Sequence, residues 1–482
     1  MKQLRIVFTS DIHGQAEKLL QCAQTFNKNA DTLVIDGGDI LQGSPLSTYL
    51  HTQGIGAEPI ARTLNIAGYD FITPGNHDFN YGPDYLRAYL HALNATCVCT
   101  NVHGPLPVVP YVIHTLPNGL KVGITGIVTD YVTVWEKAEN LRGIHISNPF
   151  DAAGQALEQM KPAVDVSLCI YHGGFEGDAA STENIGTRIC RELDFDILLT
   201  GHQHMPIEGE LHHNTYIVQP EANAKHFIEL TAAVDENGVR CHSQFISPAG
   251  EAPANQREHL TALHNDLQAW LDTPVGTLAA PMPMADRVQM ALHGSTIAAL
   301  YNRVQLEASG AQLSCVGLAN VMPGFDRDVR RRHIVENYPF SNQLVTLKIS
   351  GAQLAQVLER TASYLSVDDE GTPHITPSFL HPKVEHYNYD FFSGLTYCAD
   401  LRRPVGARVS DVKVKGELIQ PEDTFTLCLS NYRATGTGGY GVYTQCPVIE
   451  YGHEISDLVS DYISRKGNIR VENEEVVHWI YT

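Results

Sequence analysis

Short apolar runs that end abruptly in polar residues dominate the first half of the chain. Five such segments read "LRIVFTSDIHG", "TLVIDGGD", "FITPGNHD", "VSLCIYHGG" and "DILLTGHQH". Runs this rich in Val, Ile and Leu predict strands that are buried on both faces. Helix-like segments, such as 16–26 and 83–93, lie between several of them. This alternation predicts a layered α/β domain.

The polar ends of these predicted strands are expected to meet. In layered α/β sheets, the loops beyond the carboxyl ends of the strands form the usual crevice for ligands. The five polar clusters could therefore converge on one site.

The pattern changes near Ser247. The stretch "SPAGEAPANQ" predicts a loop, and residues 257–271 then carry Leu and Trp at helical spacing. A second set of elements follows, with a helix-like run over 295–308 and a strand–helix pair in "LVTLKISGAQLAQVLERTASYL". We therefore expect one domain at 1–246, a linker with a helix at 247–272, and a second domain at 273–482.

Composition narrows the class of partner. The 482 residues include 43% hydrophobic and 18% charged residues, which is typical of a globular protein with two or three domains. The formal net charge of -21 would repel a phosphate polymer at long range, so we expect no duplex nucleic acid as the main partner.

Cysteine usage and hydropathy narrow the expected compartment. Ten cysteines occur without CxxC pairs, so no disulfide framework is indicated. No apolar stretch reaches the length of a membrane span, and "MKQLRIVFTSDIHG" lacks the pattern of a signal peptide. The expectation is a cytoplasmic protein with no membrane partner, with export possible if a leader has been removed.

The strand-end side chains have the chemistry of metal ligands. They are Asp11, His13, Asp39, Asn76, His77, His172, His202 and His204. Imidazoles, carboxylates and an amide suit Mn, Fe, Co or Zn, and the absence of cysteine argues against a structural zinc. Eight groups exceed the needs of one tetrahedral ion. Two ions about 3.5–4 Å apart, bridged by one carboxylate, would use them and would clamp both oxygens of a phosphoryl displacement.

Each cluster has a plainer alternative when it is taken alone. A lone "DIHG" or "GHQH" is more often a capped turn than a metal site. An isolated His172 would more often be a hydrogen-bonded core histidine than a ligand. The five clusters in order on strand ends make coincidence improbable, which favours a two-metal site.

The five blocks resemble those of the calcineurin-like metallophosphoesterases, whose pattern is D-x-H, GD, GNH, a lone His and GH-x-H. The C-terminal half resembles the second domain of bacterial 5'-nucleotidases, so the resemblance covers nearly the whole chain. It implies an N-terminal four-layer α/β/β/α metallophosphoesterase domain and a C-terminal α/β nucleotidase-type domain.

The resemblance also implies roles for the candidate residues. One metal would be held by Asp11, His13 and His204. The other would be held by Asn76, His172 and His202. Asp39 would bridge the two metals, and His77 would stabilise charge on the phosphate or protonate the leaving oxygen. In "PGNHDFN", Gly75 would permit the turn, and Asp78 would support it or act as a capping carboxylate.

One position departs from the 5'-nucleotidases of the UDP-sugar hydrolase type. They place an aspartate three residues after the histidine that corresponds to His77, whereas this chain has Asn80. The stretch "GNHDFNYG" instead resembles the 2',3'-cyclic-nucleotide 2'-phosphodiesterases with 3'-nucleotidase activity. A neutral partner is expected to leave His77 a weaker base. Gly438 also replaces an aspartate of the 5'-nucleotidases.

The second domain carries candidates for nucleotide binding. "YPFSN" resembles the nucleotidase segment whose phenylalanine stacks on the base, which implies base recognition by Phe340 and Asn342. Tyr432, in "NYRATGTGGYG", falls where the family places a second stacking ring. The alternative for Phe340 is a ring buried in the core.

We therefore expect a metal-dependent phosphoric ester hydrolase with two divalent ions, Mn, Zn, Fe or Co. A metal-bound hydroxide would attack phosphorus in line. The expected substrates are nucleotides, with 2',3'-cyclic nucleotides and 3'-nucleotides slightly ahead of 5'-nucleotides. One alternative is a UDP-sugar or dinucleotide pyrophosphatase. Another is a non-catalytic sensor that binds a nucleotide or a metal.

Overall fold

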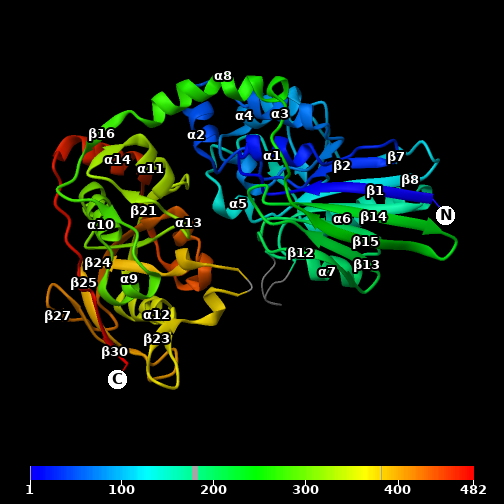
Figure 1. The fold of residues 1–482 in the computed structure, drawn as a ribbon. Helices are drawn as coiled ribbons and strands as arrows, with labels where there is room; N and C mark the ends of the chain where they lie inside the picture. Colours follow the sequence, from blue (N-terminus) through cyan, green and yellow to red (C-terminus); the bar gives the residue numbers. More distant parts are fainter. Residues whose placement is uncertain (1, 176–182, 382, 482) are drawn as a thin grey trace. The chain divides into compact units, whose positions relative to one another are not determined.

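The structure is a computed structural model that describes residues 2–175, 183–381 and 383–481. The chain divides into two compact units, Met1–Leu267 and Gln268–Thr482 (Figure 1). The division falls inside α8 (Ala254–Leu271), the helix that the leucine spacing predicted as a linker. Domain boundaries at 246 and 273 remain a prediction.

The first sheet of the N-terminal unit has seven strands. Their spatial order is β15 (Gly238–Ile246), β14 (Phe227–Asp235), β1 (Lys2–Thr9), β2 (Thr32–Asp36), β3 (Phe71–Ile72), β4 (Thr96–Val98) and β6 (Val108–Val109). The strands from β1 to β6 are parallel, whereas β14 and β15 form an antiparallel hairpin at one edge.

The second sheet of this unit has six strands. Their order is β12 (Ile207–His212), β13 (Thr215–Gln219), β11 (Ile197–Thr200), β10 (Val166–His172), β8 (Lys121–Val128) and β7 (Tyr111–Thr115). The four central strands, β13 to β8, are parallel.

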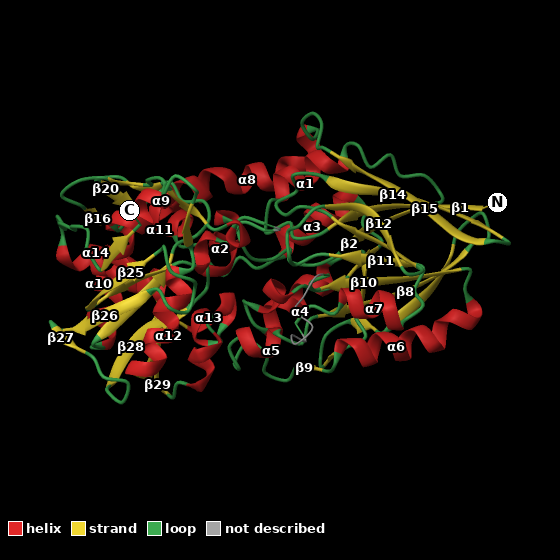
Figure 2. Cartoon of the chain, turned by 90° about the horizontal axis from the view of Figure 1, so that it is seen from below, coloured by secondary structure: helices red, strands yellow, loops and turns green. Residues whose placement is uncertain are grey.

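Apolar side chains fill the space between the two sheets. Leu4, Ile6 and Phe8 of β1 share one buried cluster with Leu168 and Ile170 of β10. Helices cover the outer faces. The helices α1 (Ala16–Ala23), α3 (Glu58–Ala67) and α4 (Pro83–Ala92) lie together on one side (Figure 1), and α6 (Pro149–Met160) and α7 (Gly186–Glu192) lie beside the strands of the second sheet (Figure 2). Burial on both faces explains the continuous apolar runs. The predicted four-layer α/β/β/α arrangement is confirmed.

The predicted helices occur, with small differences in length; α8, for example, begins at Ala254 rather than at residue 257. The helix expected over 16–26 ends at Ala23. Phe26 lies beyond it, where its ring packs edge-on against Phe227, with 5.0 Å between ring centroids. Apolar periodicity alone does not distinguish a residue that is buried within a helix from one that is buried just beyond the end of the helix. The short elements of this unit are α2 (Pro45–Thr52), α5 (Val132–Trp135), β5 (Val102–His103) and β9 (His145–Ile146).

The C-terminal unit is built on a five-stranded sheet. Its order is β24 (Asp390–Ser393), β18 (Leu313–Gly317), β28 (Thr424–Ser430), β21 (Gln343–Ser350) and β29 (Val448–Glu454). A four-stranded sheet accompanies it, formed by β27 (Glu417–Leu418), β26 (Val409–Val414), β25 (Leu395–Asp400) and β30 (Val477–Ile480).

Helices pack on both faces of the five-stranded sheet. α10 (Thr296–Ser309) and α14 (Ile455–Lys466) share one apolar cluster with it, and α12 (Gly351–Ala362) packs in a second cluster with strands of both sheets. The sequence directs the start of α12, because Ser350 and Gln353 form a capping box. The remaining helices are α9 (Arg287–His293), α11 (Arg331–Asn337) and α13 (Asn431–Ala434).

All ten cysteines are free in this structure. Among the helices in the described ranges, none combines the length and the apolar character that crossing a bilayer requires.

Candidate metal centre

The candidate ligands lie at or just beyond the carboxyl ends of five strands from the two sheets of the N-terminal unit. The strands are β1, β2, β3, β10 and β11. His172 is the last residue of β10, and the other ligands follow their strands by a few residues. The convergence expected from the five polar clusters therefore takes place.

The first group consists of Asp11, His13 and His204, whose ligand atoms all lie within 4.8 Å of one another. Nε2 of His204 lies 3.2 Å from Oδ1 of Asp11 and 3.0 Å from Nε2 of His13. Nδ1 of His13 donates to the carbonyl oxygen of Gln42 at 2.9 Å, because a carbonyl only accepts. This bond leaves Nε2 of His13 as the atom that faces the other two ligands.

The second group consists of Asp39, His172 and His202, again within 4.8 Å. Nδ1 of His172 donates to the carbonyl oxygen of Gly37 at 2.6 Å, so its Nε2 points to the group. That Nε2 lies 3.2 Å from Oδ2 of Asp39 and is buried without a hydrogen-bond partner. Oδ1 of Asn76 lies 2.8 Å from Nδ1 of His202, which adds the amide to this group.

The two groups adjoin and suit divalent cations. Oδ1 of Asp11 lies 4.0 Å from Nε2 of His172. Asp11 and Asp39 are 0% and 1% exposed, and no lysine or arginine in the described part of the chain pairs with either. Buried carboxylates need a compensating positive charge. The orphaned Nε2 of His172 and these two carboxylates fit metal ions.

Without metal, the carboxylates and imidazoles perturb one another. Burial alone would raise the pKa of Asp11, but the hydrogen bond to His204 and the charges of His204 and His172 together outweigh burial, so this pKa lies below its usual range. Burial is also the largest single influence on Asp39, but the charges of His172, His77 and His13 together outweigh it and hold the pKa of Asp39 well below its usual range. Burial lowers the pKa of His172, yet Asp39 raises it to about 10. Burial and the charge of His204 lower the pKa of His13 to about 4.

The backbone at the centre is strained. Eleven non-glycine residues in the described ranges have positive φ, and five of them are candidate ligands: Asp11, His13, Asp39, His202 and His204. L-residues in the left-handed region cost about 1–3 kcal/mol each and cluster at functional sites. Such a concentration indicates that the loops are shaped for the ligands rather than for local stability.

The turn that begins at Gly75 combines close packing with capping. A Cβ there would lie 2.2 Å from Oδ1 of Asp39 and 2.7 Å from Cε1 of His172, so only glycine fits. Asp78 is 2% exposed, and its two oxygens accept the backbone N–H groups of Asp39, Ile40, Leu41 and Gly75. Asp78 is therefore a capping carboxylate that ties two loops together.

His77 belongs to neither ligand group. Its ring lies edge-on to that of His13, with 5.5 Å between centroids, and it is partly exposed. Nδ1 of His77 lies 2.8 Å from Oδ1 of Asn80, and the backbone N–H of His77 donates to Oδ1 of Asp39 at 2.7 Å. The side chain thus stands beside the metal ligands with its Nδ1 already engaged.

The candidate base-binding residues lie in the C-terminal unit at neighbouring strand ends. Phe340 and Asn342 precede β21, and Tyr432 follows β28, which pairs antiparallel with β21. Phe340 is 38% exposed, so the alternative of a ring buried in the core is wrong. Nδ2 of Asn342 lies 3.5 Å from the hydroxyl of Tyr338.

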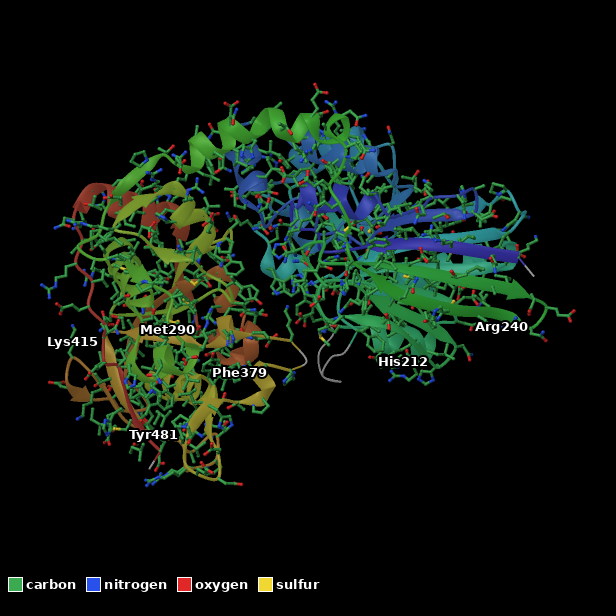
Figure 3. The ribbon with its side chains drawn as sticks, in the orientation of Figure 1. His212, Arg240, Met290, Phe379, Lys415 and Tyr481 are labelled. Carbon is green, nitrogen blue, oxygen red and sulfur yellow. The ribbon has the colours of Figure 1, made fainter. Side chains whose placement is uncertain are left out.

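Gly438 occupies a position that a side chain could not enter. Its φ is +72°, and a Cβ would lie 2.1 Å from Oδ1 of Asn388 and 2.6 Å from Nη1 of Arg433. Its carbonyl oxygen accepts a hydrogen bond from Arg360, whose guanidinium lies 4.3 Å above the ring of Phe379. Figure 3 labels Phe379 in the C-terminal unit. Packing in this loop therefore explains the departure from aspartate.

Three residues near the centre carry no motif and were missed. The ring of Trp135 stacks on His202 with 5.4 Å between centroids, and Oε1 of Glu183 lies 3.7 Å from Nε2 of the same histidine. Glu136 accepts a hydrogen bond from the side-chain amide of Asn80. No periodicity or spacing in "VTVWEKAEN" signals these contacts.

Comparison with known families agrees with this geometry. Residues 4–206 match the family described as calcineurin-like phosphoesterase, and residues 274–445 match the 5'-nucleotidase C-terminal domain. The chain joins a calcineurin-like phosphoesterase domain to a 5'-nucleotidase C-terminal domain. The predicted fold and the predicted enzyme class, a metal-dependent phosphoric ester hydrolase, are confirmed at this level.

Individual relatives of these two domains are similar over nearly the whole chain. A Staphylococcus aureus structure assigned as a 5'-nucleotidase, in complex with alpha-ketoglutarate, matches with a TM-score of 0.89 and 27% identity, covering 99% of this chain and 100% of that chain. The 2',3'-cyclic-nucleotide 2'-phosphodiesterase/3'-nucleotidase of Haemophilus influenzae is 24% identical over 95% of this chain and 84% of its own length. The trifunctional nucleotide phosphoesterase YfkN of Bacillus subtilis is also 24% identical over 95% of this chain, which spans 38% of that protein.

Proposed function

We propose that this protein is a dinuclear-metal phosphohydrolase of nucleotides that favours 2',3'-cyclic nucleotides and 3'-nucleotides over 5'-nucleotides. The observation that carries the proposal is the convergence of two adjoining ligand groups around two buried carboxylates, neither of which pairs with a lysine or arginine in the described part of the chain. The likeness to a 2',3'-cyclic-nucleotide 2'-phosphodiesterase/3'-nucleotidase and the amide at Asn80 support the substrate preference.

Each of the two ligand groups of the candidate centre would hold one metal ion. Asp11, His13 and His204 would hold one ion. Asn76, His172 and His202 would hold the other, with Asp39 between the two. When bound, the ions supply Lewis-acid chemistry that stabilises phosphoryl charge and makes water a nucleophile near neutral pH. Mn, Zn, Fe and Co all suit this set of nitrogen and oxygen ligands.

His77 is the proposed catalytic residue that does not bind metal. Because Nδ1–H donates to Oδ1 of Asn80, Nε2 is the nitrogen that can take up a proton from water, and the imidazolium so formed would give that proton to the leaving oxygen. Phe340 and Tyr432 are the proposed stacking rings for the base, and Asn342 is the proposed polar contact. Stacking on a ring contributes about 1–3 kcal/mol per base and tolerates any base.

The test is hydrolysis of a substrate panel by metal-stripped protein refilled with manganese or zinc. The panel contains 2',3'-cyclic AMP, 3'-AMP, 5'-AMP, UDP-glucose and bis-p-nitrophenyl phosphate. The proposal expects the cyclic and 3' substrates to lead. A lead for 5'-AMP would reverse the proposed preference, and a lead for UDP-glucose would favour a pyrophosphatase.

His77→Ala separates an enzyme from a nucleotide sensor. Turnover should fall roughly 10²–10⁴-fold, the usual contribution of a general acid, while metal content and nucleotide binding persist. His91→Ala, on the exposed side of α4, is the matched control and should keep full turnover. Nucleotide binding by wild-type protein without hydrolysis of any panel member would favour the sensor.

A further inference from the structure

A chain of side-chain hydrogen bonds extends from His77 away from the candidate metals. Oδ1 of Asn80 lies 2.8 Å from Nδ1 of His77, and Nδ2 of Asn80 donates to Oε2 of Glu136. The other oxygen of Glu136 accepts from the backbone N–H of Lys137 at 2.7 Å and from Nδ2 of Asn140 at 2.9 Å. Asn140 also donates to the carbonyl oxygen of Asn80 at 2.8 Å. One oxygen of Glu136 is therefore held by two donors, and its other oxygen faces Asn80.

This network decides which way the Asn80 amide points. A carboxylate only accepts hydrogen bonds, so the NH₂ group of Asn80 must face Glu136. Its carbonyl oxygen then faces His77 and accepts a proton from Nδ1. The neutral ring of His77 is thereby fixed as the Nδ1–H tautomer, with Nε2 unprotonated.

The asparagine and the glutamate form a matched pair. An aspartate at position 80 would place two carboxylates within hydrogen-bond distance, and one of them would have to take up a proton. With Asn80 between them, the carboxylate stays one residue further from the imidazole. Its charge still polarises the amide and strengthens the acceptor that faces Nδ1.

We propose that Glu136 is a positioning residue that acts through Asn80 to hold His77 in the Nδ1–H tautomer for the phosphohydrolase reaction. The proposal rests on the proposed function for its kinetic consequence, whereas its structural consequence holds with or without turnover. It explains how the chain supports His77 although the aspartate of the UDP-sugar hydrolase type is missing.

The substitution Glu136→Gln tests whether Glu136 acts on His77 through Asn80. The oxygen of the new amide should remain with Lys137 and Asn140, because both of them donate. Its NH₂ group would then face the NH₂ group of Asn80, and these two donors repel. The Asn80 amide should turn over and present Nδ2 to His77, whose proton then sits on Nε2.

The readout is the tautomer of His77 in zinc-loaded holoenzyme, measured by long-range ¹⁵N–¹H correlation and assigned by the signals lost in His77→Ala. We expect Nδ1–H in the wild type and a shift to Nε2–H in Glu136→Gln. Glu139→Gln, an exposed glutamate of the same segment, is the matched control and should keep the wild-type tautomer. An unchanged tautomer in Glu136→Gln overturns the proposal.

A double variant adds a rescue. Asn80→Asp alone should be impaired because it faces Glu136 with a second carboxylate, and Glu136→Gln alone should lower kcat roughly 10–100-fold with little change in KM. Together the two substitutions rebuild a chain in which an aspartate accepts from both the new amide and Nδ1 of His77. The double variant should regain the Nδ1–H tautomer and most of the lost kcat.

The outcomes separate this inference from the proposed function. A double variant as poor as the product of the singles overturns the positioning role, as does an unchanged tautomer in Glu136→Gln. Absence of hydrolysis by the wild type defeats the proposed function, while the tautomer still tests the hydrogen-bonded chain. Should Glu136→Gln fail to fold, recovery of kcat when it is added to Asn80→Asp supports the proposal, and absence of recovery overturns it.

Discussion

His172 shows at the scale of one residue how the centre is prepared for metal. Its Nδ1 is committed to a backbone carbonyl, and its Nε2 is buried beside Asp39 without a hydrogen bond. In the metal-free protein burial lowers the pKa of His172, but Asp39, Asp11 and the carbonyl oxygen of Gly37 together outweigh burial and raise this pKa to about 10. A bound cation would take the place of that proton.

The first prediction follows from this exchange. A histidine pKa raised from about 6.5 in the unfolded chain to about 10 stabilises the fold below pH 6.5, and that stabilisation is lost as the pH rises toward 10. Metal requires the neutral imidazole and compensates Asp39 at any of these pH values. The thermal stabilisation by zinc, measured as the Tm difference between zinc-loaded and metal-stripped protein, should therefore grow from pH 6.5 to pH 9. A difference that shrinks over this range would contradict the assignment of His172.

At the scale of elements, the conformation of the turn after β3 is constrained by the side chains of Asp39 and His172, which lie against it. Gly75 has ordinary extended dihedral angles, with φ of -97° and ψ of 177°. Its constraint is therefore space, since Asp39 and His172 press against it. Asp78 then fastens this turn to the loop that follows β2.

The second prediction concerns this turn. Gly75→Ala should displace Asp39 and lower metal content by at least one equivalent, as measured by elemental analysis after dialysis, together with a fall in Tm. The control is Gly68→Ala at the end of α3, where φ is +80° and no atom lies within 4 Å of the added Cβ. That variant should lose about 1 kcal/mol of stability and keep its metals. Full metal content in Gly75→Ala would show that the turn is not part of the centre.

At the scale of the whole molecule, the candidate functions divide along the chain. Every candidate metal ligand lies between residues 11 and 204, and every candidate base-binding residue lies between 340 and 432. α8 begins within the phosphoesterase domain, where Thr63 and His259 are hydrogen-bonded at 2.9 Å and Leu260 packs with Leu20. A fragment that ends after α8 therefore keeps the core contacts of this domain.

The third prediction uses that fragment. Residues 1–272 should fold, bind two equivalents of zinc or manganese, and hydrolyse bis-p-nitrophenyl phosphate. They should lose the preference among nucleotides, because Phe340, Asn342 and Tyr432 are absent. Calorimetric metal titration and the substrate panel check both points, with Asp39→Asn in the fragment as the control that should lose metal. A folded fragment that keeps the nucleotide preference would remove these three residues from substrate recognition.

The layered fold and the candidate ligands can both be predicted from the order of the residues. Strands buried on both faces must be apolar throughout, and metal ligands come from few residue types at strand ends, so both leave local signatures in the order of the residues. The expectations for Asp11 or His204 needed no knowledge of which loops touch.

The residues that contact and orient those ligands and His77 could be identified only from the tertiary structure. Glu136 meets Asn80 across 56 residues, and Trp135 meets His202 across 67, through loops whose approach depends on how two sheets pack. The exposure of Phe340 and the crowded space at Gly438 are likewise set by neighbours distant in sequence. A carboxylate or an indole ring has many uses in a protein, so its residue type alone does not specify its partner. The packing of the fold decides which partner such a side chain contacts, and no local sequence pattern indicates that contact.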